Sequence, residues 1–457
     1  MKRLLICTTI VLFLATASFS QTNSTSKDMV RLVTLDPGHF HAALVQKSMY
    51  KNVDPEVHVY APAGPDVKWH LERIDAYNSR KDEPTKWKEE VYTGNDFFEK
   101  MLADKAGNVV VLAGNNQKKT EYIAKSINAG LNVLGDKPMV INSQEFEKLK
   151  GAFETAAKKN LLLYDIMTER FEITTIIQKE LSMMPEVFGT LQKGTPDNPA
   201  VQKESVHYFY KYVSGNVLTR PTWFMDVDQA GEGIVDVTTH LVDLVQWECF
   251  PGQSVDYTKD IQLTSAKRWT TDMTRSEFTQ ITKVDDFPDF LKKDVVNDSI
   301  LKVYCNGEIN YKIKGINAKV TVKWGYKAAD GAGDSHFSIL RGTKANVVIR
   351  QGEEQNYIPS LYVEPANNDA AFEKTLREQI RKIQVKYPGV DLKKSTAGWE
   401  VTIPEKYREG HEAHFARVTR QFLEYLQNRN MPKWEVPNML AKYYITTKAL
   451  ELAKQKK

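Results

Sequence analysis

The chain has 457 residues, of which 42% are hydrophobic and 10% aromatic, and its formal net charge is +4. A globular chain of this length divides into two domains, and this apolar content is enough to fill a core in each. The near balance of charge excludes a strongly basic surface, so the composition gives no indication of a nucleic-acid or membrane-surface partner.

The first twenty residues have the pattern of a secretory signal. Lys2 and Arg3 precede an apolar run over 4–17 and a small-residue finish at 18–20. We predict that 1–20 is a cleaved signal peptide, that the protein is exported to the periplasm, and that the polar residues 21–29 form a spacer. A membrane anchor is the alternative, but the run is shorter than the roughly 20 residues that a spanning helix needs.

Between residues 30 and 168, short β-branched runs alternate with helical patterns. Strands are expected at 31–35, 56–60, 108–113, 131–134 and 161–165, and helices at 41–50, 120–129 and 143–159. Strands separated by helices pair in parallel, so this region is predicted to be an α/β domain with a doubly wound, Rossmann-like sheet.

From residue 169 to 457 the pattern changes to strands that follow one another. They are expected at 205–213, 259–268, 299–305, 308–314, 317–324, 336–341 and 345–350, with helices at 368–386, 411–427 and 437–454. Turns at 305–307 and 331–333 favour hairpins, so we predict an α+β domain with a mainly antiparallel open sheet. Its two cysteines, Cys249 and Cys305, are too few for a disulfide scaffold, and they either pair or remain buried thiols.

The turn after the first strand stands where a dinucleotide fold places its glycine-rich loop. In a G-x-G-x-x-G frame, Asp36 replaces the first glycine, Gly38 is the second and His41 replaces the third. An ordinary turn with one glycine is the alternative to nucleotide binding. The second strand ends without the carboxylate that would hold a ribose hydroxyl, so NAD and NADP both stay open as the cofactor.

Two further segments resemble the glucose-fructose oxidoreductase / inositol dehydrogenase / rhizopine-catabolism family. The segment 109–116 ends in Asn116, and 129–139 carries Asp136-Lys137-Pro138 where that family has Glu-Lys-Pro. A lysine at the end of a parallel strand points into the ligand crevice, where partial burial can lower its pKa, whereas most lysines are solvated surface residues. The resemblance implies that Lys137 lies beside the nicotinamide and the substrate hydroxyl.

The second motif spans 231–247. Asp236, His240 and Asp243 are spaced i, i+4 and i+7, which puts them on one face of an otherwise apolar helix. A salt-bridged helix start is the alternative, and the spacing supplies too few ligands for a metal site, so no metal is predicted. The segment resembles the family's Gly-Gly-Gly-x3-Asp-x-Gly-x-His-x2-Asp signature, except for Glu232 and Thr238 at two glycines.

The resemblance extends over roughly 30–450 and implies roles for individual residues. Residues 365–408 look like an insertion. The implied catalytic residues are Lys137, His240 and Asp236; the implied cofactor contacts are Gly38, His39, Phe40, Asn116, Asp136 and Lys137; and Asp243, Arg170 and Trp223 are weaker candidates for substrate contact. Arg170 also fits a structural role, and Trp223 fits the core.

Three functions are compatible with these residues. The first is an exported NAD(P)-dependent oxidoreductase that acts on a hydroxyl of a sugar, glycoside or polyol, with a tightly held nicotinamide cofactor that is recycled on the enzyme. The second is an NAD-dependent glycosidase that works by transient oxidation and elimination. The third is a non-catalytic sugar-binding protein, suggested by the eroded glycine turn. The family often forms homo-oligomers through the open face of the second sheet, and the resemblance implies the same here.

Overall fold

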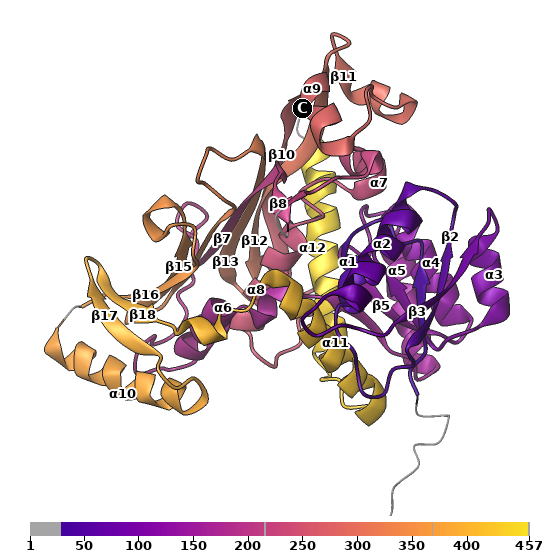
Figure 1. Ribbon diagram of the computed structural model, residues 1–457. Helices are drawn as coiled ribbons and strands as arrows, with labels where there is room; N and C mark the ends of the chain where they lie inside the picture. The colour runs from indigo at the N-terminus through magenta and orange to yellow at the C-terminus, as the bar shows by residue number, and fades with distance from the viewer. Residues whose placement is uncertain (1–28, 214–215, 368, 456–457) are drawn as a thin grey trace, which may run out of the picture.

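A computed structural model describes residues 29–213, 216–367 and 369–455, so the predicted signal peptide lies outside the described residues. The described residues form two large sheets, each with its own hydrophobic core, and one small two-stranded sheet (Figure 1). None of the helices in these ranges is both long and apolar enough to cross a membrane.

The first sheet is six-stranded, entirely parallel and ordered β3-β2-β1-β4-β5-β6, as expected for a Rossmann-like domain. Its strands are β1 (Leu32–Leu35), β2 (Glu56–Ala61), β3 (Lys88–Thr93), β4 (Val109–Leu112), β5 (Asn132–Asp136) and β6 (Leu163–Ile166). Its helices are α1 (His41–Val45), α2 (Pro65–Ser79), α3 (Phe97–Asp104), α4 (Lys119–Asn128) and α5 (Phe146–Lys158). The β-branched runs that predicted β1 and β4 are fully buried in this core.

Two features of the first domain differ from the sequence prediction. The predicted helix over 41–50 ends at Val45. The elements α2, β3 and α3 were not predicted. The strand β3 is an edge strand with sequence KEEVYT, and none of its residues is fully buried, so it lacks the apolar alternation that reveals a strand.

The second sheet is ten-stranded and mainly antiparallel, in the order β10-β12-β13-β7-β14-β15-β16-β18-β17, with β11 paired to β12. Its strands are β7 (Val201–Tyr210), β10 (Ile261–Thr274), β11 (Val295–Val296), β12 (Ile300–Ile313), β13 (Ile316–Lys327), β14 (Ser335–Arg341), β15 (Ala345–Gln351), β16 (Ser360–Pro365), β17 (Asp391–Ser395) and β18 (Gly398–Thr402). Beside this sheet lie the hairpin of β8 (Tyr212–Val213) and β9 (Asn216–Val217), several short 3-10 helices, and the α-helices α6 (Ile173–Ser182), α7 (Val227–Ala230), α8 (Thr238–Cys249), α9 (Arg275–Thr282), α10 (Ala370–Lys386), α11 (His411–Asn428) and α12 (Glu435–Gln455).

Both predicted hairpins in this sheet are wrong. Residues 305–307 do not turn, because β12 runs unbroken through them. Gly307 is needed there for another reason: a Cβ on it would lie 2.6 Å from Cβ of Ile234, which packs against the strand. The turn near 331–333 joins β13 to β14, but these strands are not neighbours, since β7 lies between them and pairs in parallel with β13.

The C-terminal helices connect the two halves. Phe415 and Phe422 of α11 belong to the core of the first sheet. The helix α12 runs between the halves (Figure 1) and contributes Tyr443 to the first core but Ile445 to the second. The two halves therefore share a packed junction.

The segment predicted as an insertion, 365–408, enlarges the edge of the second sheet. After β16 it forms α10, β17 and β18, and β18 pairs with β16. Cys249 and Cys305 remain free thiols.

Candidate active site

A cavity of about 620 Å³ is lined by residues of both halves. It lies at the carboxyl end of β5, where open α/β sheets bind their ligands. Seven of the nine histidines of the chain line it: His39, His41, His207, His240, His336, His411 and His414. Glu405 and Arg408, which belong to the predicted insertion, also reach its wall.

Lys137 and Asp236 meet in this cavity from opposite halves of the chain. Lys137 directly follows β5, and its Nζ donates a hydrogen bond to Oδ1 of Asp236 at 2.5 Å. Burial lowers the pKa of Lys137, but the attraction of Asp236 and Asp136 outweighs it, so the pKa is raised overall. The expected lowering of the Lys137 pKa is therefore wrong, and Lys137 is a charged donor.

His240 lines the same cavity, next to Lys137 and Asp236. Burial and the charge of Lys137 lower its pKa to about 4, so the imidazole is neutral at pH 7. Its Nδ1 is buried and has no hydrogen-bond partner within the described part of the chain. The helix α8 begins at Thr238, so Asp236 lies just before the helix and not on its face. The carboxylate of Asp236 contacts Lys137.

The residues around the end of β5 fit the nicotinamide half of a dinucleotide. Of the residues predicted to contact the cofactor, His39, Phe40, Asn116, Asp136 and Lys137 line the cavity, whereas Gly38 lines the smaller pocket beside it. The atoms Nδ1 of His39, Oδ1 of Asn116 and Oδ1 of Asp136 are buried without a partner in the ranges that the structure covers. The carboxamide and ribose hydroxyls of a nicotinamide nucleotide are groups that could satisfy such atoms.

The turn at Gly38 is covered by the side chains of Asp66 and Trp223. Asp36 has a φ of 48°, a left-handed conformation that suits the glycine it replaces in the fingerprint. A Cβ on Gly38 would lie 2.9 Å from Oδ2 of Asp66 and 3.0 Å from the Trp223 ring. A pyrophosphate at this turn therefore requires the side chains of Asp66 and Trp223 to move aside.

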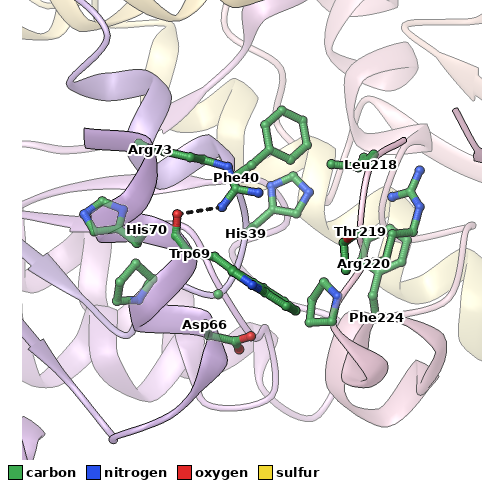
Figure 2. Close-up of a pocket in the computed structure, with 14 residues that line it drawn as sticks. His39, Phe40, Asp66, Trp69, His70, Arg73, Leu218, Thr219, Arg220 and Phe224 are labelled. Atoms are coloured by element: carbon green, nitrogen blue, oxygen red, sulfur yellow. Dashed lines mark hydrogen bonds between the residues drawn. The ribbon is translucent and has the colours of Figure 1, made fainter. Parts of the chain in front are cut away.

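A second, narrow pocket of about 20 Å³ lies beside this turn. Figure 2 shows Trp69 and Arg73 of α2 on one side of it and the segment 218–224 on the other, with His39 and Phe40 between them. Trp223 belongs to that segment. It is largely buried but lines the large cavity, and its Nε1 donates to Oδ2 of Asp66.

Arg170 and Asp243 do not reach the cavity. The guanidinium of Arg170 donates to both carboxylate oxygens of Asp243, at 2.6 and 2.7 Å, and also to Glu435. Lys442 bonds to Asp243 at 2.8 Å and to Asp165 at 2.7 Å. All five side chains are buried, so the predicted substrate contact of Arg170 and Asp243 is replaced by a structural ion network at the junction of the halves.

Sequence reasoning missed a polar group on another part of the cavity wall. Nε2 of His207 lies 2.5 Å from Oγ of Ser205, and its Nδ1 lies 3.2 Å from Oδ2 of Asp334. Burial alone would raise the pKa of Asp334, but His207 and Lys211 lower it to about 2. The spacing of Ser205 and His207 along β7 puts both on one face and was a usable signal, whereas no local pattern indicates Asp334.

Arg220 was also missed. Its guanidinium donates to the carbonyl oxygens of Phe209 and Tyr208 and packs 4.8 Å from the ring centre of Phe224. Burial lowers the pKa of Arg220 to about 10, and within the described ranges no carboxylate forms an ion pair with it. Arg220 lines both pockets, so its guanidinium can bind an anionic group of a ligand that lies where the two pockets meet.

Comparison with known proteins gives two family matches. Residues 67–164 match the profile described as "Oxidoreductase family, NAD-binding Rossmann fold", and residues 177–454 match "Putative oxidoreductase C terminal domain". The first match begins after the turn at 36–41, so it does not include the altered fingerprint. None of the proteins of curated function matches the sequence.

Solved structures agree in fold over nearly the whole chain. A "putative oxidoreductase" from Parabacteroides merdae is 60% identical, with a TM-score of 0.92 and 94% of this chain and 98% of that chain covered. More distant structures include levoglucosan dehydrogenase in complex with NADH and levoglucosan, at 12% identity and a TM-score of 0.60 over 93% of this chain and 98% of that chain. A "putative myo-inositol dehydrogenase" from Sinorhizobium meliloti is 12% identical, with a TM-score of 0.52 over 94% of this chain and 98% of that chain.

Proposed function

Because this chain belongs to the oxidoreductase family with an NAD-binding Rossmann fold, we propose that it oxidises a hydroxyl group of a sugar, glycoside or polyol with a tightly held NAD or NADP. The observation that carries the proposal is the contact between Lys137 and Asp236, which joins the end of β5 to the second domain inside the cavity. The sugar-related substrates of levoglucosan dehydrogenase and of the inositol dehydrogenase fold neighbour agree with this substrate class.

The bound dinucleotide would supply the hydride acceptor. Lys137, kept protonated by Asp236, donates a hydrogen bond to the substrate oxygen and stabilises the negative charge that develops on it. His240 is neutral and has an unpartnered nitrogen, so it can accept the hydroxyl proton. Asp236 holds Lys137 in place.

The test has two parts. The protein is purified from its native compartment and denatured, and the released nucleotide is identified by mass spectrometry; reduction of cofactor is then followed with a panel of sugars and polyols. We expect one nicotinamide dinucleotide per chain, and a roughly 10²–10⁴-fold lower turnover in Lys137→Met. Lys148→Met, an exposed lysine on α5, is the matched control and should keep full activity.

A chain that neither carries nor takes up a dinucleotide would contradict this function and favour a sugar-binding protein. Equal turnover in Lys137→Met and the native chain would remove Lys137 from the mechanism.

A glycosidase that oxidises transiently and then eliminates a glycosidic substituent is the second candidate. Elimination needs an acid or base in addition to the groups that act on the oxidised hydroxyl. The imidazole of His207, which Asp334 and Ser205 hold on the cavity wall, is such a group and supports this reaction. Release of a chromogenic aglycone without net NADH formation, lost in His207→Gln, would favour the glycosidase. Net NADH formation with no aglycone release would favour the simple oxidoreductase.

Export is part of the proposed function and rests on the pattern of residues 1–20. Cell fractionation and N-terminal sequencing test it. We expect periplasmic protein that begins at or near Gln21, and a cytoplasmic protein that begins at Met1 would overturn export.

A further inference from the structure

We propose that His39, His41 and Asp136 form a binding site for one divalent transition-metal cation of the zinc class, in the wall of the cavity beside Lys137. This site goes beyond the proposed oxidation. His39 lies in the turn after β1, His41 is the first residue of α1, and Asp136 is the last residue of β5. Two imidazoles and one carboxylate are a common three-ligand set for zinc and related ions.

The three side chains converge on one point. Nδ1 of His41 lies 2.9 Å from Oδ2 of Asp136, and Nδ1 of His39 lies 3.8 Å from the same oxygen. One ligand atom from each residue lies within 4.8 Å of the others. Ligand atoms on a tetrahedral zinc ion, at bonds of about 2.0–2.1 Å, are roughly 3.3 Å apart, so the observed spacing needs only small side-chain movements.

The group has unused binding capacity. Asp136 and His41 are 3% and 7% exposed, yet Oδ1 of Asp136 has no hydrogen-bond partner in the described part of the chain, and neither does Nδ1 of His39. Unpartnered polar atoms are costly in a buried setting unless a ligand or ordered water satisfies them. A cation bound to His39 and Asp136 would remove that cost, and at these two atoms it would take the place of the nicotinamide groups.

The surroundings leave a position open for a fourth ligand. All three residues line the cavity, so an ion they hold is accessible to a substrate oxygen or to water. The neighbouring ammonium of Lys137 is already paired with Asp236, which limits its repulsion of a cation. Three protein ligands with one open position are the arrangement of catalytic zinc sites.

Metal binding is tested on the full chain, with no added nucleotide. The protein is treated with EDTA, dialysed and titrated with Zn²⁺ by calorimetry, and separately with Co²⁺ while its visible absorption is recorded. We expect one Zn²⁺ per chain and the visible bands of bound Co²⁺. His39→Ala and Asp136→Asn should each weaken Zn²⁺ binding roughly 100-fold or more, by loss of a direct ligand.

His336→Gln is the matched control, because His336 lines the same cavity but does not belong to the cluster, and it should bind Zn²⁺ as the native chain does. Thermal melting confirms that each variant is folded, and Asp136→Asn preserves side-chain shape if an alanine variant is unstable. The proposal is overturned if the native chain binds no Zn²⁺, or if His39→Ala and Asp136→Asn bind it with unchanged affinity.

Discussion

The indole Nε1 of Trp223 donates a hydrogen bond to Oδ2 of Asp66 at 2.8 Å, and both side chains lie against Gly38. Trp223 comes from the second half of the chain and Asp66 from the first turn of α2, so this contact joins the two halves over the nucleotide turn. A side chain that covers a binding turn lowers the apparent affinity by the fraction of time that the turn is covered.

Replacing Trp223 by alanine should therefore open the turn. If the native turn is open less than about a tenth of the time, Trp223→Ala should raise the apparent affinity for dinucleotide at least about ten-fold. Protein fluorescence during NAD titration of the nucleotide-free chain measures this. Asp66→Asn, which keeps a hydrogen-bond acceptor for the indole, is the control. Weaker binding by Trp223→Ala would mean that the indole contacts the cofactor instead of covering its site.

The pairing of Lys137 with Asp236 predicts a change in the pH profile of turnover. In Asp236→Asn the largest of the attractions that raise the pKa of Lys137 is lost, so burial counts for more and that pKa falls. Since the protonated lysine is the active form, the alkaline limb of the kcat profile should move to lower pH, and kcat should fall roughly 10–100-fold. Steady-state kinetics over a pH series checks this. An alkaline limb that stays in place would show that Lys137 does not act through its charge.

The buried ion network predicts a large effect of Asp243 on stability. Asp243→Ala removes the buried carboxylate that Arg170 and Lys442 share and leaves each cation with one buried partner, Glu435 or Asp165, so we expect the free energy of unfolding to fall by about 3 kcal/mol. Urea denaturation measures the loss. Glu373→Ala, which breaks an exposed pair on α10, should cost less than about 1 kcal/mol. Equal effects of the two substitutions would contradict the network's role.

Buried histidines predict that the protein loses stability in mild acid. Burial lowers the pKa of His70 to about 3 and those of His240 and His336 to about 4. Below the unfolded-state pKa of about 6.5, the unfolded chain therefore binds protons that the folded chain does not, and stability falls as the pH drops from about 6.5 towards 4. Each histidine contributes up to about 1.4 kcal/mol per pH unit.

Urea midpoints measured across this pH range check the slope. His70→Gln should reduce it by one proton's contribution, because the substituted side chain no longer titrates. A free energy of unfolding that does not change between about pH 6.5 and 5 would show that these histidines are protonated in the folded protein.

Much of the fold could be predicted from local sequence. A continuous apolar run such as 109–112 is typical of a strand in a parallel sheet that is covered on both faces. The helices α4 and α5 have the amphipathic periodicity of surface helices. The edge strand β3 could not be found, because its polar sequence carries no period. The pair Asn306-Gly307 was wrongly predicted as a turn, because the glycine serves the close approach of Ile234, which is distant in sequence.

The sequence by itself determined the two-domain class, the family resemblance and the motifs that carry Lys137, Asp236 and His240, because these depend on residue type and spacing within short segments. Only the tertiary structure decided which of these residues meet. It brought Lys137 to Asp236 and His39 and His41 to Asp136, and it placed Asp243 with Arg170 instead of in the cavity. Such pairings depend on how strands and helices that are far apart in the chain pack together. Contacts of this kind produce no local periodicity in the sequence, so the sequence alone does not reveal them.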